Sequence, residues 1–202
     1  MMSTGGPGWQ VVAGSSRVLL FALYLRDCAG LEAVGSPLLP PVIPPVRRAD
    51  PCQLVHAAGG LTVLRIEWET WWYQLVGDCF DAKATAPGFP ELDSLPALQL
   101  LARAHYGAGL DWARERRTEY VAMAERRGGS LRQPEPFDQL VHERELELGR
   151  DARPFTLRVV ELPLSEARAW FVEPGTLLMS QDLATDPPTF SSYVRPVVEL
   201  LA

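Results

Sequence analysis

The chain has 202 residues, of which 47% are hydrophobic and 22% are charged, and its formal net charge is −6. Of its 19 basic residues 18 are arginines, because Lys83 is the only lysine. A P-loop ends in Gly-Lys, whereas Ala82 precedes this lysine, so a phosphate-binding loop of that type is excluded. The excess of arginine over lysine indicates a GC-rich coding sequence of bacterial type.

The cysteines and the apolar segments indicate the cellular compartment of the chain. Cys28, Cys52 and Cys79 are an odd, widely spaced set, which predicts no disulfide framework and favours a reducing environment. The longest apolar run, Val18–Leu25, has eight residues, whereas a membrane span needs about 20. Residues 1–16 lack the basic side chain with which a signal peptide begins. We therefore expect a cytoplasmic chain that makes no contact with a membrane.

The glycine-rich start predicts a flexible N-terminus over residues 1–14, followed by one domain over residues 15–202. Ser15 or Ser16 is placed to cap a helix that runs to about Ala29. The apolar residues of this stretch also fit a buried strand, and their spacing does not decide between the two.

Residues 37–51 contain six prolines, which lack a backbone donor and therefore exclude a helix or a central strand. Two P-x-x-P matches, Pro37–Pro40 and Pro41–Pro44, have the spacing of polyproline ligands. The leucines, valines and isoleucine between the prolines are too apolar for a solvated linker. We therefore expect an extended segment packed on the domain surface in preference to an SH3-type ligand.

Residues 61–76 have the pattern of a half-buried strand, because Leu64, Ile66 and Trp68 alternate with polar neighbours. On such a strand Glu67 and Glu69 share one face at a spacing of about 7 Å. Two carboxylates so placed can act as general acid and general base. The alternative is that they form an ordinary solvated face.

Four aromatic side chains follow in the same segment, namely Trp68, Trp71, Trp72 and Tyr73. Large aromatic side chains dominate the energetics of protein interfaces, so these four are the candidate binding residues. The alternative is that they fill the core.

The rest of the chain contains helices and strands in separate runs. Helices are expected over 94–106, 112–127, 138–148 and 193–201, and strands over 155–162, 169–172 and 176–180. Most of the helices are bounded by a capping residue before them and a glycine after them. This order predicts an α+β fold, a single domain with a small, mainly antiparallel sheet packed against several helices.

The sequence motifs of common catalytic and cofactor-binding sites are incomplete or absent. His142-Glu143 resembles the start of a zincin motif, but Leu146 stands where the second histidine is required. No G-x-S-x-G, G-x-G-x-x-G or C-x-x-C sequence occurs, so we expect no cofactor and no metal. Cys79 with His105 or His142 stays a candidate nucleophilic pair, because such partners need only meet in space.

The arginines of residues 111–132 are interleaved with acids, six positive charges against four negative. This pattern indicates a solvated helix with i,i+3 ion pairs, and no nucleic-acid partner is expected. Together the patterns predict a non-catalytic protein–protein interaction module of accessory or immunity type. The alternative is a small cytoplasmic enzyme, a hydrolase or an isomerase, that uses Glu67 and Glu69 or a His/Cys pair.

Overall fold

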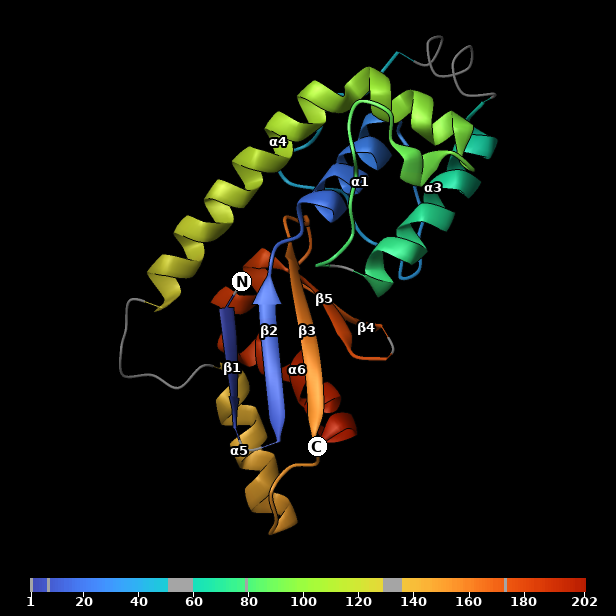
Figure 1. The fold of residues 1–202 in the computed structure, drawn as a ribbon. Helices are drawn as coiled ribbons and strands as arrows, with labels where there is room; N and C mark the ends of the chain where they lie inside the picture. Colours follow the sequence, from blue (N-terminus) through green and yellow to red (C-terminus); the bar gives the residue numbers. More distant parts are fainter. Residues whose placement is uncertain (1, 7, 51–59, 79, 129–135, 173) are drawn as a thin grey trace. The chain divides into compact units, whose positions relative to one another are not determined.

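The computed structural model describes residues 2–6, 8–50, 60–78, 80–128, 136–172 and 174–202 (Figure 1). The chain is an α+β protein whose contacts divide it into two compact units. Unit 1 comprises Met1–Ser15 and Tyr120–Ala202, and unit 2 comprises Ser16–Glu119. Within the described ranges, no helix has both the length and the apolar character that a membrane crossing requires.

Unit 1 is built on a mixed sheet, in which five strands of the described residues lie in the order β1-β2-β3-β5-β4. The strands are β1 (Met2–Gly6), β2 (Trp9–Gly14), β3 (Phe155–Leu162), β4 (Ala169–Val172) and β5 (Thr176–Ser180). The β1–β2 and β4–β5 pairs are antiparallel, whereas the β2–β3 and β3–β5 pairs are parallel. The expectation of a mainly antiparallel sheet was therefore only partly right, because half of these pairings are parallel.

The N-terminal residues, expected to be flexible, form the paired strands β1 and β2 (Figure 1). Glycine in β1 allows the two strands to approach each other closely. A Cβ on Gly5 would lie 2.5 Å from the carbonyl oxygen of Trp9, and only glycine avoids such a clash. Trp9 and Val11 are both buried in the core of unit 1. Burial of these side chains therefore fixes a segment whose composition suggested mobility.

Two helices, α5 (Pro136–Leu148) and α6 (Pro187–Leu201), pack on one face of the sheet. The buried residues of α6 are Phe190, Val194, Val197 and Val198. Their spacing places them on one stripe of the helix. The ring of Phe190 meets that of Phe137 on α5 edge to face, with centroids 5.1 Å apart. The sheet and the two helices thus share one hydrophobic core.

Unit 2 is helical in its described part. It contains α1 (Arg17–Cys28), α3 (Leu61–Gly77), the 3-10 helix η1 (Pro90–Leu92) and the residues of α4 (Pro96–Gly128) up to Glu119. Ser16 caps α1 by accepting a hydrogen bond from the amide of Leu19, which identifies the ambiguous segment as a helix. Residues 19–26 are all buried, and a helix buried on every side has no polar face to reveal its period.

Residues 61–77 form the helix α3, so the predicted strand over 61–76 was wrong. Ile66, expected inside, is 60% exposed, whereas Glu67, expected outside, is 9% exposed. The buried residues of α3 are Leu64, Glu67, Trp68, Trp71, Trp72, Leu75 and Val76. Their spacing of three and four residues follows the helical period.

The helices expected over 94–106 and 112–127 are one continuous helix, α4. The glycines between them do not end it. A Cβ on Gly109 would lie 2.6 Å from the ring of Phe21 and 2.9 Å from that of Tyr24. Glycine in a helix costs about 1 kcal/mol relative to alanine, but here it allows α4 to pack directly on α1.

Candidate functional site

Helix α3 carries most of the sequence-predicted site residues, and its geometry separates the two glutamates. Residues two positions apart differ by about 200° around a helix axis. Glu67 and Glu69 therefore do not share a face, and the proposed acid–base pair is not assembled by α3.

Glu67 faces the inside of unit 2, where its carboxylate binds the start of α4. Its Oε2 accepts a hydrogen bond of 2.8 Å from the backbone amide of Leu98. Leu98 lies in the first turn of α4, whose amides lack partners within the helix and whose dipole favours a negative charge. This contact accounts for the buried carboxylate, which joins α3 to α4.

Glu69 and Arg65 bind the loop that follows α1. The Oε1 of Glu69 accepts a hydrogen bond from the amide of Gly35 at 3.2 Å. Arg65 donates to the carbonyl oxygens of Glu32 and Ala33 at 2.5 and 3.3 Å. Both charged side chains thus hold backbone groups of residues 32–35.

Three of the four candidate aromatic residues lie inside unit 2. The exposed fractions of Trp68, Trp71 and Trp72 are 0, 2 and 1%. The rings of Trp68 and Trp72 stack with their centroids 5.2 Å apart, and the indole nitrogen of Trp68 donates to the carbonyl oxygen of Ala22 at 2.8 Å. These indoles join α3 to α1, and within the set of four only Tyr73, 77% exposed, presents its ring to solvent.

Part of the exposed side of α3 is uncharged, next to the exposed Arg65 and the half-buried Glu69. We call this uncharged part the α3 face, and it consists of Thr62, Val63, Ile66, Thr70, Tyr73, Gln74 and Gly77, all of them exposed. The exposed fractions of Val63, Ile66 and Tyr73 are 42, 60 and 77%. The solvent side of a surface helix normally carries charged residues. Sequence reasoning found Tyr73 but missed this face, because the strand interpretation placed Ile66 in the core.

A second feature of unit 2 is the clamp that Arg26 and Asp27 form on the proline-rich segment. The Nε of Arg26 lies 2.5 Å from Oδ1 of Asp27. Its Nη1 and Nη2 donate to the carbonyl oxygens of Leu39 and Pro40 at 3.1 and 2.9 Å. The Oδ2 of Asp27 accepts a hydrogen bond from the amide of Val42 at 2.8 Å. The two charged residues at the end of α1 thus hold residues 39–42 in place.

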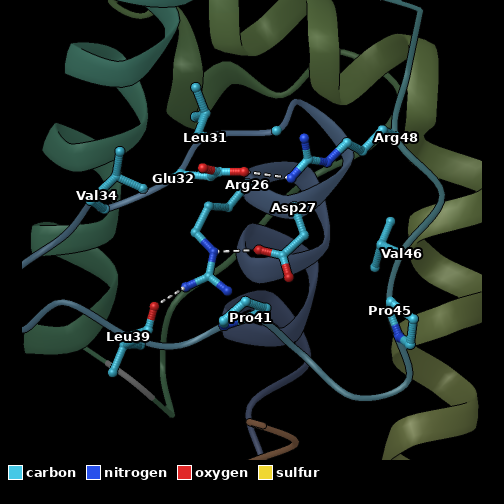
Figure 2. Close-up of a pocket in the computed structure, with 12 residues that line it drawn as sticks. Arg26, Asp27, Leu31, Glu32, Val34, Leu39, Pro41, Pro45, Val46 and Arg48 are labelled. Carbon is cyan, nitrogen blue, oxygen red and sulfur yellow. Dashed lines mark hydrogen bonds and ion pairs between the residues drawn. The ribbon is translucent and has the colours of Figure 1, made fainter.

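Beside this clamp lies a pocket of about 350 Å³ (Figure 2). Its apolar walls come from Leu31, Val34, Leu39, Pro41, Pro45 and Val46. Figure 2 shows Arg26 and Asp27 side by side among these residues, and an ion pair between Glu32 and Arg48 at 2.6 Å. The sequence indicated the apolar character of the proline-rich segment, but no local pattern showed that its prolines line a pocket.

Cys28, at the end of α1, meets His105 of α4. The Sγ of Cys28 lies 3.5 Å from Nδ1 of His105. Burial raises the pKa of the Cys28 thiol, and hydrogen bonds from the Ala49 backbone and the Tyr24 side chain offset this only in part. Burial, and next the neighbouring Cys28, also raise the pKa of Tyr24. Sequence reasoning named His105 but paired it with Cys79, which lies outside the described residues.

We expect native Cys28 to react with iodoacetamide at pH 8 at least about tenfold more slowly than in the urea-unfolded chain, because the thiolate is the nucleophile and burial disfavours it. Since its pKa is raised, the native rate should increase only well above pH 8.5, where free thiols ionise. Mass spectrometry of the Cys28 peptide measures both rates. Faster labelling in the native chain, extending below pH 7, would instead indicate an activated Cys–His pair.

His142 lies on an exposed part of α5, with its Nδ1 4.0 Å from Glu145. Within the described ranges, no group of three or more His, Cys, Asp or Glu residues is placed to hold a metal ion. Comparison with protein-family models, with curated proteins and with solved structures finds no match to this chain.

Proposed function

We propose that the chain is a non-catalytic protein-interaction module of accessory or immunity type, and that it binds a protein partner through the α3 face. The observation that carries this proposal is a stripe of three exposed apolar or aromatic residues on α3, bordered on one side by the exposed Arg65. Val63, Ile66 and Tyr73 follow one another at intervals of three and seven residues, so they form one stripe. Exposed apolar surface of this kind is typical of interaction sites.

The environments of the candidate acids support the same proposal. Glu67 and Glu69 each bind a backbone amide, of Leu98 and Gly35 respectively. A general acid or base must reach the proton it transfers, whereas these carboxylates are engaged in holding α4 and the loop after α1. The proposed function therefore uses the surface of α3 and not its glutamates.

The net charge of the chain indicates the charge of the partner. A formal net charge of −6 favours a partner with a basic surface, because opposite charges steer association. The α3 face itself is uncharged. We therefore expect the association rate constant to fall as salt concentration increases, and the dissociation rate constant to change little.

The test compares the tagged full chain with two variants, Ile66→Asp and Leu200→Asp, purified from the cells in which the protein occurs. The two positions match closely, since both are on helices and are 60% and 61% exposed. Wild type and Leu200→Asp should retain one stoichiometric partner, and Ile66→Asp should lose at least about tenfold in affinity for it. Absence of a stoichiometric partner with the wild type, or equal recovery with all three chains, would overturn the proposal.

The second candidate function is a small cytoplasmic hydrolase or isomerase, and one observation favours it. Cys28 and His105 are within 3.5 Å of each other, which is the order of distance between a nucleophile and its base. The raised pKa of the thiol and its burial weigh against this function. Fast labelling of native Cys28 in the iodoacetamide experiment would favour this second function, and slow labelling would contradict a Cys28–His105 nucleophile.

A further inference from the structure

We infer that the pocket beside Arg26 and Asp27 binds a small uncharged molecule, made of one apolar ring or branched chain and one amide-like polar group. This inference is independent of the α3 face. All the residues that line the pocket belong to residues 26–48 of unit 2.

The size and walls of the pocket define the apolar part of the ligand. Small-molecule sites have volumes of about 300–1,000 Å³, and a cavity of about 150 Å³ is enough to hold benzene. A pocket of about 350 Å³ therefore holds one ring with a substituent. Leu31, Val34 and Val46 are among its aliphatic wall residues, and such walls favour an apolar ring.

The paired charges beside these walls define the polar part. A guanidinium has five N–H groups, and the hydrogen bonds of Arg26 to described residues use three of them. Each carboxylate oxygen of Asp27 accepts one hydrogen bond from a described residue and has a second lone pair. The clamp thus offers donors and acceptors side by side. A primary amide has the matching groups, a carbonyl oxygen for Arg26 and an NH₂ for Asp27.

Charge balance at the buried Arg26–Asp27 pair disfavours an ionic ligand. Among the described lining residues, the charges are two arginines and two acids, joined as the pairs Arg26–Asp27 and Arg48–Glu32. A ligand that carried a charge would have to break one of these pairs or remain uncompensated, and the Arg26 side chain is only 3% exposed. Loss of one partner from a buried pair is strongly unfavourable. The pocket therefore selects against charged molecules of the same shape.

The test uses three probes of one shape, namely benzamide, benzoate and benzylamine, which are neutral, anionic and cationic at pH 7. Each is titrated into the full chain carrying ¹³C-labelled methyl groups, and the resonances of Leu31, Val34 and Val46 are followed. Benzamide should produce saturable shifts at these methyl groups, with an affinity at least tenfold higher than that of either charged probe. An absence of shifts with benzamide, or equal affinity for a charged probe, would overturn the inference.

Two variants locate the site. Val46→Trp fills the pocket and should abolish the benzamide shifts at Leu31 and Val34, whereas Val121→Trp, at an exposed position of α4, should preserve them. Persistence of the shifts in Val46→Trp would place the probe elsewhere and overturn the inference. The comparison of the three probes on the wild-type chain needs no variant, so it decides the question even if Val46→Trp fails to fold.

Discussion

Replacing Arg26 by methionine is expected to lower the free energy of unfolding by about 3–5 kcal/mol. The same replacement at Arg48 should lower it by less than about 1 kcal/mol. Both arginines form short ion pairs, of 2.5 and 2.6 Å, but their side chains are 3% and 67% exposed. Urea denaturation followed by far-ultraviolet circular dichroism measures the two effects.

The difference arises from what each arginine leaves behind. Without Arg26, the largely buried Asp27 carboxylate loses its charge partner, and the carbonyl oxygens of Leu39 and Pro40 lose their donors. Buried groups without partners cannot turn to water. The carboxylate of Glu32, which is 75% exposed, is instead hydrated when Arg48 is removed.

Hydrogen exchange gives a local readout of the same change. The amide of Val42 donates to Asp27, so its protection should decrease in Arg26→Met and remain in Arg48→Met. Equal losses of stability in the two variants, or unchanged protection of Val42 in Arg26→Met, would show that the clamp does not hold the proline-rich segment.

Replacing Trp68 by alanine is expected to lower the free energy of unfolding by about 3–5 kcal/mol, the usual cost of removing a buried aromatic side chain. Its ring is fully buried, stacks on Trp72 and donates to the carbonyl oxygen of Ala22. Tyr73→Ala, on the same helix, removes a ring that is 77% exposed and should change stability by no more than about 0.5 kcal/mol.

Trp68→Phe separates packing from hydrogen bonding at this position. Phenylalanine retains a ring but lacks the indole N–H, so the loss should be smaller than in Trp68→Ala by more than about 1 kcal/mol. Thermal and urea unfolding of the three variants measure these differences. A loss in Tyr73→Ala as large as in Trp68→Ala would contradict the assignment of the two residues to core and surface.

The C-terminal part of the fold follows from the sequence because its signals are local. The strands expected over 155–162, 169–172 and 176–180 have the observed bounds. The first two are rich in β-branched or aromatic residues, and the third is a short, mostly apolar run. The last helix begins at Pro187, earlier than the expected residue 193. Pro187 and Pro188 precede the expected start, and proline is well suited to the first turn of a helix.

The errors in the N-terminal part have long-range causes. Glycines in β1 and α4 suggested mobility or a helix end, but Gly5 and Gly109 are there because a neighbouring element approaches too closely for a Cβ. In α3, Glu67 is buried because the start of α4 supplies its hydrogen-bond partner. A charged residue at an inward position breaks the apolar pattern of a helix, so the segment resembled the alternation of a strand. No single stretch of sequence contains both partners of such a contact.

The candidate site was predictable only in part for the same reason. The pattern of residues 61–76 identified the segment, and Tyr73 is exposed there, but the α3 face emerges only once the helical period is known. The pocket depends on contacts between the end of α1 and residues 39–48, and the Cys28–His105 contact joins residues 77 positions apart.

The parallel pairing of β2 with β3 has a consequence for biosynthesis. The chain leaves the sheet at Gly14 and re-enters it at Phe155, so a ribosome completes all of unit 2 before β3 is made. Until then β2 has an unpaired edge, and the side chains of Trp9 and Val11 lack the core that later covers them. Unpaired edges and exposed apolar residues promote aggregation. Unit 2 is contiguous in sequence, so all of its residues are synthesised before β3, whereas the sheet of unit 1 is complete only when almost the whole chain has been made.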